Sequence, residues 1–219
     1  MKNCKKKEEI ISTGSKLIIE KGYLNTSIQD ITSKMGIAKG SFYTYFKSKD
    51  EFILTIIFNK ISEFKTEVEE IVVSECTLEE AMRKYFLHAL SVPAKEPEFF
   101  ILLMNLLNNI NSLSQKISKF LLTNTPLKYR GVKMILEKYS DELDMEVKKS
   151  SEELDRYSVI ICNLVNTFYD HKFKPMMETY QKNNNHHFDL VQVKKSLESI
   201  DLEAEVNFLT KITMKIISK

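Results

Sequence analysis

The residues most suited to chemistry gather near the start of the chain, in the stretch TSIQDITSKMGIAKGSFYTYFKSKDEF at 26–52. Tyrosines and lysines alternate there with small polar residues, and no recognisable pair of nucleophile and base accompanies them. A lysine can contact a phosphate or the edge of a guanine, and a tyrosine hydroxyl can donate to a phosphate oxygen. These residue types therefore indicate contact with a nucleic acid rather than catalysis.

The spacing within this stretch predicts two short helices joined by a tight turn. Ile28, Ile31 and Met35 recur at helical intervals and so form one face of a helix. Gly36 follows and is expected at positive φ. A short third helix is expected over about 38–46. Two helices joined by a glycine-containing turn of about three or four residues form a helix-turn-helix, whose second helix enters the DNA major groove by its N-terminal residues.

The third helix is expected to have one packing face and one DNA-contacting face. At about 100° per residue, Phe42 and Phe46 share a side that packs on the first two helices. Gly40 and Thr44 point the opposite way, where small and polar residues permit close approach to base edges. The predicted DNA-binding residues are Thr26, Ser27, Ala38, Lys39, Gly40, Ser41, Tyr43, Thr44, Tyr45 and Lys49.

Within this set, several residues are expected to contact phosphates. Tyr43 and Tyr45 can each brace the helix with a ring and offer a hydroxyl to a phosphate. Thr26 can also offer a hydroxyl to a phosphate, at the start of the second helix, where the helix dipole favours an anion. Lys49 begins the fourth helix, where another phosphate could lie, and Lys39 can reach a guanine edge or a phosphate.

The composition predicts helices throughout. Only 5 glycines and 4 prolines punctuate 219 residues, while Leu, Ile, Lys, Glu and Met, mostly good helix formers, are plentiful. The predicted class is all-α, with a three-helix DNA-binding head followed by a larger helical body. Thr77 and Glu80 form a capping-box pattern, and Pro93 and Pro97 bracket an expected break. The expected helices span about 5–21, 27–34, 38–46, from 48 or 49 into 69–76, 77–92, 97–110, 112–140 with a break before Pro126, 150–172 and 201–217.

The charge is spread unevenly along the chain. Residues 1–49 hold ten lysines and four acidic residues, a net charge of +6, whereas residues 50–219 hold 22 basic and 26 acidic residues. This segregation suggests a polyanion-binding head on a neutral-to-acidic body, although a solvated lysine-rich surface would look the same. The expected domains are a helix-turn-helix DNA-binding domain at 1–49 and a helical effector-binding and dimerisation domain at 50–219.

The stretch at 26–52 resembles the DNA-binding signature of the TetR family, the tetracycline-repressor-like transcriptional regulators. With the first helix, the resemblance spans roughly residues 5–52, and the helical remainder agrees only in length and class. Ala38 departs from the pattern, because the family often has a serine there that could cap the third helix. The matching pieces are Thr26, Ile28, Ile31, Gly36-Ile37, Gly40-Ser41, Phe42-Tyr43, Tyr45-Phe46 and Lys49.

The resemblance implies a homodimer that binds a double-stranded DNA operator, most often an inverted repeat, and a body that binds a small-molecule effector. Most members are repressors that leave the operator when the effector binds. An apolar pocket could be lined by Phe86, Phe99, Phe100, Met104, Met134, Tyr139, Asn166 and Tyr169, which favours a hydrophobic effector. A dimer interface in the last two long helices could include Tyr157, Ile161, Leu164, Phe168, Val206, Leu209, Thr213 and Ile216. All of these residues could equally form the core of one chain, and the body could bind a partner protein instead.

Two other classes of function are open. An enzyme would need a phosphate loop, metal-ligand spacing or a catalytic motif, so no catalytic residue, metal or cofactor is expected. The lysine-rich start at 2–7 could bind a lipid surface or a protein, or act as a basic arm on DNA phosphates. His186-His187 are expected to be exposed in a polar loop, and His88 and His171 stand alone on helices. Three separated cysteines, no convincing signal peptide and no apolar run of about 18 residues fit a cytoplasmic protein without a membrane partner.

Overall fold

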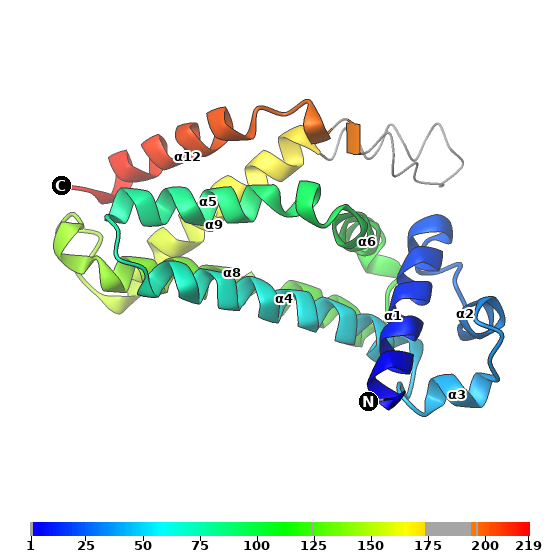
Figure 1. The fold of residues 1–219 in the computed structure, drawn as a ribbon. Coiled ribbons are helices and arrows are strands. Elements are labelled where there is room, and N and C mark those ends of the chain that lie inside the picture. The colour runs from blue at the N-terminus through cyan, green and yellow to red at the C-terminus, as the bar shows by residue number, and fades with distance from the viewer. Residues whose placement is uncertain (1, 124, 174–193, 196) are drawn as a thin grey trace. The chain divides into compact units, whose positions relative to one another are not determined.

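Helices form most of the described chain, which comprises residues 2–123, 125–173, 194–195 and 197–219 of a computed structural model (Figure 1). The predicted all-α class is confirmed, and none of the helices in these ranges is long and apolar enough to cross a membrane. Within these ranges, an isolated antiparallel β-bridge joins Leu143 to Ser218. The helices are α1 (Lys2–Lys21), α2 (Ile28–Lys34), α3 (Lys39–Tyr43), α4 (Lys49–Val73), α5 (Leu78–Lys95), α6 (Pro97–Asn108), η1 (Ile110–Ser112), α7 (Gln115–Thr123), α8 (Thr125–Lys138), η2 (Ser140–Glu142), α9 (Ser151–Lys172) and α12 (Leu202–Ile217).

The described residues pack into two compact units. The first consists of residues 2–60, 96–123 and 194–195, so it holds α1–α3, the start of α4, α6 and α7. The second consists of residues 61–95, 125–173 and 197–219, so it holds the end of α4, α5, α8, α9 and α12. A division by packing does not test the predicted functional boundary between residues 49 and 50, which stays a prediction.

Three phenylalanines form the centre of the first unit's helix-turn-helix. Phe42 and Phe46, predicted to share the packing side of α3, are 0% and 1% exposed. Their rings lie 5.4 Å apart, and each contacts Phe52 of α4, at centroid distances of 5.8 and 5.2 Å. Ile10 of α1 and Ile31 of α2 are also fully buried, and α2 packs on both α1 and α3. Apolar side chains from four helices therefore hold α3 in place.

The turn of the motif depends on a glycine, and the helix after it is shorter than predicted. Gly36 has φ = 64°, in the left-handed region that was expected for it. α3 spans Lys39–Tyr43 rather than 38–46. Ala38 supplies no side-chain cap, and the Tyr45 N–H donates to the Phe42 carbonyl, three residues back, at 2.9 Å. The chain therefore leaves α3 through a tight turn after one helical turn.

Polar caps fix the starts of four helices where the sequence predicted them. Ser27 caps α2, and Ser150 caps α9 by accepting a hydrogen bond from the Glu153 N–H. Asp201 caps α12 in the same manner. The predicted box before α5 also forms, since the Thr77 N–H donates to the Glu80 carboxylate at 2.9 Å and the Glu80 N–H donates to the Thr77 hydroxyl at 3.2 Å. These bonds satisfy backbone donors that a helix start leaves free.

α5 is the central helix of the second unit. It packs against α8, α9 and α12, and Figure 1 shows α5 and α12 side by side. Tyr85 and Phe86 on α5 are 2% and 0% exposed. The Tyr85 hydroxyl lies 3.4 Å from Sγ of Cys162 on α9, and burial raises the pKa of Tyr85 well above its usual value. A salt bridge of 2.8 Å between Lys172 and Glu205 joins α9 to α12.

The end of α5 corrects one expectation from the sequence. The helix was predicted to end near 92, but it continues through Pro93 to Lys95. A proline has no N–H, so the carbonyl four residues before it, that of Ala89, loses its helical partner. The Tyr169 hydroxyl of α9 donates to that carbonyl instead. A side chain from a neighbouring helix thus satisfies the acceptor that the proline leaves open.

Gly14 of α1 is expected to tolerate no side chain. A Cβ built there would lie 2.4 Å from Cζ of Phe52 and 3.1 Å from Cδ1 of Ile31. Gly14→Ala should lower the free energy of unfolding by about 1–2 kcal/mol, because overpacking outweighs the roughly 1 kcal/mol that alanine gains in helix propensity. Urea unfolding followed by circular dichroism measures the change.

The control for this substitution is Gly40→Ala. A Cβ at Gly40 would meet no atom within 4 Å, so the variant should be as stable as the wild-type protein or slightly more stable. A Gly14→Ala protein with unchanged stability would contradict the packing of α1 on Phe52.

Candidate nucleic-acid interface

α3 presents a small and polar face in the first unit. Ala38, Lys39, Gly40 and Thr44 are exposed, and Tyr43 is 48% exposed. Because a Cβ at Gly40 would meet no neighbouring atom, the backbone is open at this position. This is the face that was predicted to approach base edges. Its assignment to DNA contact rests on its shape and chemistry.

The two tyrosines of this region are partly packed and partly exposed. The Tyr43 ring contacts Phe42 edge-to-face, with 5.8 Å between the ring centroids. Tyr45 and Ser41 are half-buried at the border of the exposed face. The placement of Tyr43 agrees with the predicted combination of a bracing ring and an exposed phenol.

Positive charge borders this face. Lys34, Lys39 and Lys47 have exposed side chains, and the Lys7 ammonium of α1 lies 5.5 Å from the centroid of the Phe46 ring. Exposed ammonium groups attract a phosphate backbone over a screening distance of about 10 Å at 0.1 M salt. α1 already begins at Lys2, so the lysines predicted to form an arm before the first helix lie within that helix.

The start of α2 differs from the predicted phosphate site. The Ser27 N–H donates to the Asp30 carboxylate at 2.8 Å, and the Asp30 N–H donates to the Ser27 hydroxyl at 3.0 Å. The hydrogen bond from the Ser27 side chain lowers the pKa of Asp30, which keeps the carboxylate charged. A phosphate approaching this helix end would therefore meet a negative charge, and the dipole argument made for Thr26 does not hold here.

Thr26 itself is buried, at 1% exposure. Its hydroxyl donates toward the carbonyls of Gly22 at 2.9 Å and of Leu17 at 3.3 Å, both near the end of α1. A threonine hydroxyl has one hydrogen to donate, and here that hydrogen is already used. The prediction that Thr26 donates to a phosphate is therefore contradicted, because its side chain satisfies the carboxyl end of α1.

Lys49 also points inward. Its ammonium donates to the carbonyl of Tyr23 at 2.7 Å and to that of Thr26 at 2.9 Å. It lies 4.1 Å from the centroid of the Tyr23 ring, and burial lowers the pKa of the ammonium. Two of its three donors are used within the chain. The structure thus gives Lys49 an intramolecular role in place of the predicted phosphate contact.

Sequence reasoning missed two residues that complete this arrangement. The Tyr23 hydroxyl donates to the Asp50 carboxylate at 2.7 Å, and burial followed by this hydrogen bond raises the Tyr23 pKa. We call Tyr23, Thr26, Lys49 and Asp50 the loop clamp, since they join the α1–α2 loop to the first turn of α4. A lysine at a helix N-terminus opposes the helix dipole, and that mismatch was the sequence signal that could have revealed the clamp.

The residues predicted to line an effector pocket are divided between the two units. Phe86 and Phe100 are fully packed side chains, at 0% and 4% exposure. Tyr139 is also buried, at 8% exposure, and the other five members are half-buried. The first unit holds Phe99, Phe100 and Met104, and the second holds Phe86, Met134, Tyr139, Asn166 and Tyr169.

Two of these predicted pocket residues have structural roles instead. The Tyr139 hydroxyl donates to the Cys76 carbonyl at 2.7 Å, and the Tyr169 hydroxyl donates to the Ala89 carbonyl. Both phenols therefore have their hydrogens engaged within the chain and cannot donate them to a ligand at the same time. The physical reason is the same in both cases, because each hydroxyl satisfies a backbone acceptor outside the regular helical ladder.

The predicted dimer interface needs a larger correction. Five of the eight residues are buried in the single chain and cannot also face a second copy, because their side chains fill the core beneath α9 and α12. The buried five are Ile161, Phe168, Val206, Leu209 and Thr213, with exposures of 0%, 5%, 0%, 5% and 0%. Tyr157 and Leu164 are half-buried, and Ile216 is 37% exposed.

Two other exposed apolar side chains of these helices lie outside the predicted stripes. Ile160 on α9 is 46% exposed and Phe208 on α12 is 57% exposed. Neither was chosen from the sequence, since a stripe at helical spacing marks the buried face first. The sequence signal that could have identified each of them was an isolated large apolar residue on the polar face of its helix.

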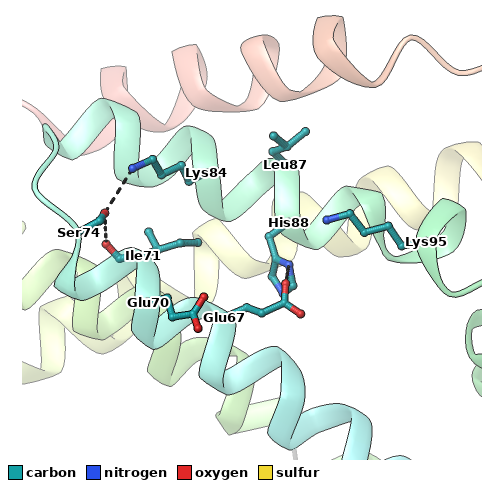
Figure 2. A pocket seen from close by; sticks show the side chains of 8 residues that line it. All are labelled: Glu67, Glu70, Ile71, Ser74, Lys84, Leu87, His88 and Lys95. Carbon is teal, nitrogen blue, oxygen red and sulfur yellow. Dashed lines mark hydrogen bonds and ion pairs between the residues drawn. The ribbon is translucent and has the colours of Figure 1, made fainter.

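A charged cleft of about 320 Å³ opens in the second unit between α4 and α5 (Figure 2). At its wall, Nδ1 of His88 lies 2.7 Å from the Glu67 carboxylate, and the imidazole stacks on Phe64 at 4.4 Å. The Lys84 ammonium donates to the Ser74 hydroxyl at 3.3 Å. The lining residues are Glu67, Glu70, Ile71, Ser74, Lys84, Leu87, His88 and Lys95, and none belongs to the predicted pocket.

Among the residues described, no group of three or more His, Cys, Asp or Glu side chains could hold a metal ion. His171 is exposed on α9, and His88 belongs to the charged cleft. The prediction that His186-His187 are exposed falls outside the described residues.

Sequence comparison supports the interpretation of the head. Residues 10–56 match the profile of the family described as bacterial regulatory proteins, tetR family. Over 50 residues the chain is 50% identical to YerO, an uncharacterized HTH-type transcriptional regulator of Bacillus subtilis (strain 168). This match covers 23% of this chain and 17% of that protein. Over 114 residues it is 27% identical to the fatty acid metabolism regulator protein of the same strain, which covers 52% of this chain and 59% of that protein. The chain therefore spans less than two thirds of either relative.

Structural comparison extends over the whole chain. The SmeT–triclosan complex matches with a TM-score of 0.69 at 14% identity, over 97% of this chain and 91% of that one. At this identity the likeness shows the fold alone. The chain thus has a head that matches a family of DNA-binding regulators and an all-helical body. Residues 10–56 match the tetR family of bacterial regulatory proteins, as the resemblance in 26–52 predicted.

Acid is expected to destabilise the second unit through His88. Burial lowers the pKa of the imidazole below its ordinary 6.5, Glu67 opposes this shift, and Lys95 adds to it. The unfolded chain therefore binds a proton at His88 more readily than the folded chain does. The stability that His88 contributes is present above pH 6.5 and is lost as the pH falls below that value. Thermal unfolding measured from about pH 7.5 to 5.5 should show the midpoint falling in acid.

His88→Gln should flatten this pH dependence, because it removes the titrating group. His171→Gln, which changes an exposed histidine on α9, should leave the dependence as it is in the wild-type protein. A pH profile that is identical in all three proteins would contradict the assignment.

Proposed function

We propose that this protein is a homodimeric transcriptional repressor that leaves its operator when a small hydrophobic molecule binds its body. It would act in the cytoplasm, on double-stranded DNA. The observation that supports this proposal most strongly is the exposed face of α3, which is small, polar and bordered by lysines, within the segment matched to the family at 10–56. The proposed functional division remains 1–49 for DNA binding and 50–219 for effector binding and dimerisation.

The proposed contacts divide into base-reading and phosphate-binding groups. Ala38, Gly40 and Thr44 present the face that can approach base edges, with Lys39 able to reach a guanine or a phosphate. Tyr43 is the best placed phosphate donor, because its ring is held by Phe42 while its side chain is 48% exposed. Ser41 and Tyr45, at the border of this face, and Ser27, at the start of α2, remain proposed contacts.

The proposed dimer uses the outer faces of α9 and α12. Ile160, Phe208 and Ile216 expose apolar surface there, and Tyr157 and Leu164 are half-buried. Large exposed apolar side chains favour association with a second protein surface. A two-fold dimer would place two helix-turn-helix motifs on one duplex and would require an operator with inverted half-sites.

The effector is proposed to be apolar. The relative that matches 52% of this chain is named a fatty acid metabolism regulator protein, and a protein of the same fold is known in complex with triclosan. Binding of such a molecule could release DNA only if it favours a conformation with lower operator affinity. Of the predicted lining in the second unit, Met134 and Asn166 remain proposed contacts, since Phe86 is fully packed and the hydroxyls of Tyr139 and Tyr169 are engaged within the chain.

Selection from random duplex DNA tests the proposal. The purified protein is expected to enrich an inverted repeat, and its affinity should fall steeply with salt because lysines displace counterions from phosphates. Binding to anionic lipid vesicles without any duplex enrichment would favour instead a membrane-surface module that uses the lysines of α1. Enrichment of a single half-site would contradict the dimer but not DNA binding.

Gly40 provides a graded test of the α3 face. Gly40→Ala should weaken binding to the selected duplex slightly, and Gly40→Leu should weaken it by at least about tenfold, because a larger side chain occupies space that the base edges need. Neither change should lower the melting temperature, since a Cβ meets nothing within 4 Å in the free protein. Equal duplex affinities for wild type, Ala and Leu would place the DNA contact elsewhere.

The dimer surface is tested by charge insertion. Phe208→Asp should convert the dimer to monomers in sedimentation experiments, because a carboxylate buried between two copies would have no partner. Phe58→Asp is the matched control, since Phe58 has the same 57% exposure but lies on α4 in the first unit. A Phe208→Asp protein that stays dimeric would rule out this face.

A further inference from the structure

We infer that Lys49 is a positioning residue for DNA recognition, which sets the placement of the helix-turn-helix through the loop clamp and does not itself bind a phosphate. The inference rests on the DNA-binding part of the proposed function. It assigns a role to Tyr23 and Asp50 as well, because they form the other half of the same clamp.

The geometry of the ammonium supports this role. Lys49 makes two hydrogen bonds of normal length to main-chain carbonyls, at 2.7 and 2.9 Å, and its ammonium sits over the Tyr23 ring at 4.1 Å. Cation–π contact and charge-assisted hydrogen bonds both favour this position over a hydrated one. The side chain is half-buried, so rotation toward a phosphate would break all three contacts at once.

The electrostatics show that the position is costly without the clamp. Lys49 is the first residue of α4, where the helix dipole repels a cation. Burial disfavours the charged ammonium further. Tyr23 and Thr26 supply carbonyl oxygens that offset both costs, and the Asp50 carboxylate stands beside them to accept the Tyr23 hydroxyl.

The clamp acts on the DNA-reading face through the next elements of the chain. Thr26 directly precedes Ser27, the cap of α2, so fixing the Thr26 carbonyl fixes where α2 begins. α2 in turn packs against α3. A clamp that opens would therefore let α2 and α3 shift together, and recognition of base edges tolerates displacements of only about 0.5 Å.

The experiment compares specific with non-specific binding in the full-length protein, well below its melting temperature. The variants are Lys49→Met, which keeps the aliphatic stem, and Tyr23→Phe, which keeps the charge at 49 but removes the bond to Asp50. Affinity is measured for the duplex selected by the wild-type protein and for a scrambled duplex, each over a range of salt concentrations. Lys47→Met, which removes a charge from an exposed side chain two residues away, is the control.

Both clamp variants are expected to lose specific affinity by about tenfold, as for one lost base contact. Their affinity for the scrambled duplex and their salt dependence should stay as in the wild-type protein. Lys47→Met should lower specific and non-specific affinity together. Because Tyr23→Phe retains every charge, it keeps the test decisive even if Lys49→Met does not fold.

Two results would overturn the inference. If Lys49→Met reduces the slope of log affinity against log salt by about 0.9 per contact while Tyr23→Phe has no effect, Lys49 is a phosphate ligand. If both variants melt earlier but keep the ratio of specific to non-specific affinity, the clamp is structural only. A wild-type protein that enriches no duplex would contradict the proposed function itself, which separates that failure from failure of the clamp.

Discussion

A lysine ammonium at the start of a helix needs hydrogen-bond acceptors. In the head, Lys49 obtains them from main-chain carbonyls of the α1–α2 loop. Its bonds to the Tyr23 and Thr26 carbonyls close the α1–α2 loop on α4. Thr26 can offer its carbonyl because its hydroxyl is anchored on the end of α1. The aromatic cluster of Phe42, Phe46 and Phe52 then fixes α3 against the same part of α4. In this arrangement the exposed face of α3 is small, polar and flanked by lysines.

The second unit follows a similar rule, in which polar side chains satisfy backbone groups that helix irregularities leave open. Tyr169 serves the carbonyl freed by Pro93, and Tyr139 serves the carbonyl of Cys76 just before α5. The apolar stripes of α9 and α12 are used first for the core of the single chain. Apolar side chains with exposed surface, such as Ile160, Phe208 and Ile216, remain for a second copy. Core packing thus limits which residues can take part in dimerisation.

The sequence predicted the elements well because their signals are local. The capping box of Thr77 and Glu80, the positive φ of Gly36 and the burial of Phe42 each depend on a few neighbouring residues. The predictions that failed depend on partners far along the chain. Lys49 donates to the carbonyls of Tyr23 and Thr26, which lie 26 and 23 positions earlier in the chain. Tyr169 donates to the carbonyl of Ala89, which lies 80 positions earlier. A helical stripe cannot tell a core from an interface, so the dimer and pocket residues could not be chosen from periodicity alone.

The central claim is that the exposed face of α3 reads DNA. Amide hydrogen exchange of the wild-type protein, measured with and without its selected duplex, tests that claim most directly and needs no variant. The account predicts that the duplex slows exchange at residues 38–45, while the amides of α5, which lie in the second unit, exchange as before. Slower exchange confined to α1, with residues 38–45 unaffected, would contradict it and would assign nucleic-acid contact to the lysines at the start of the chain.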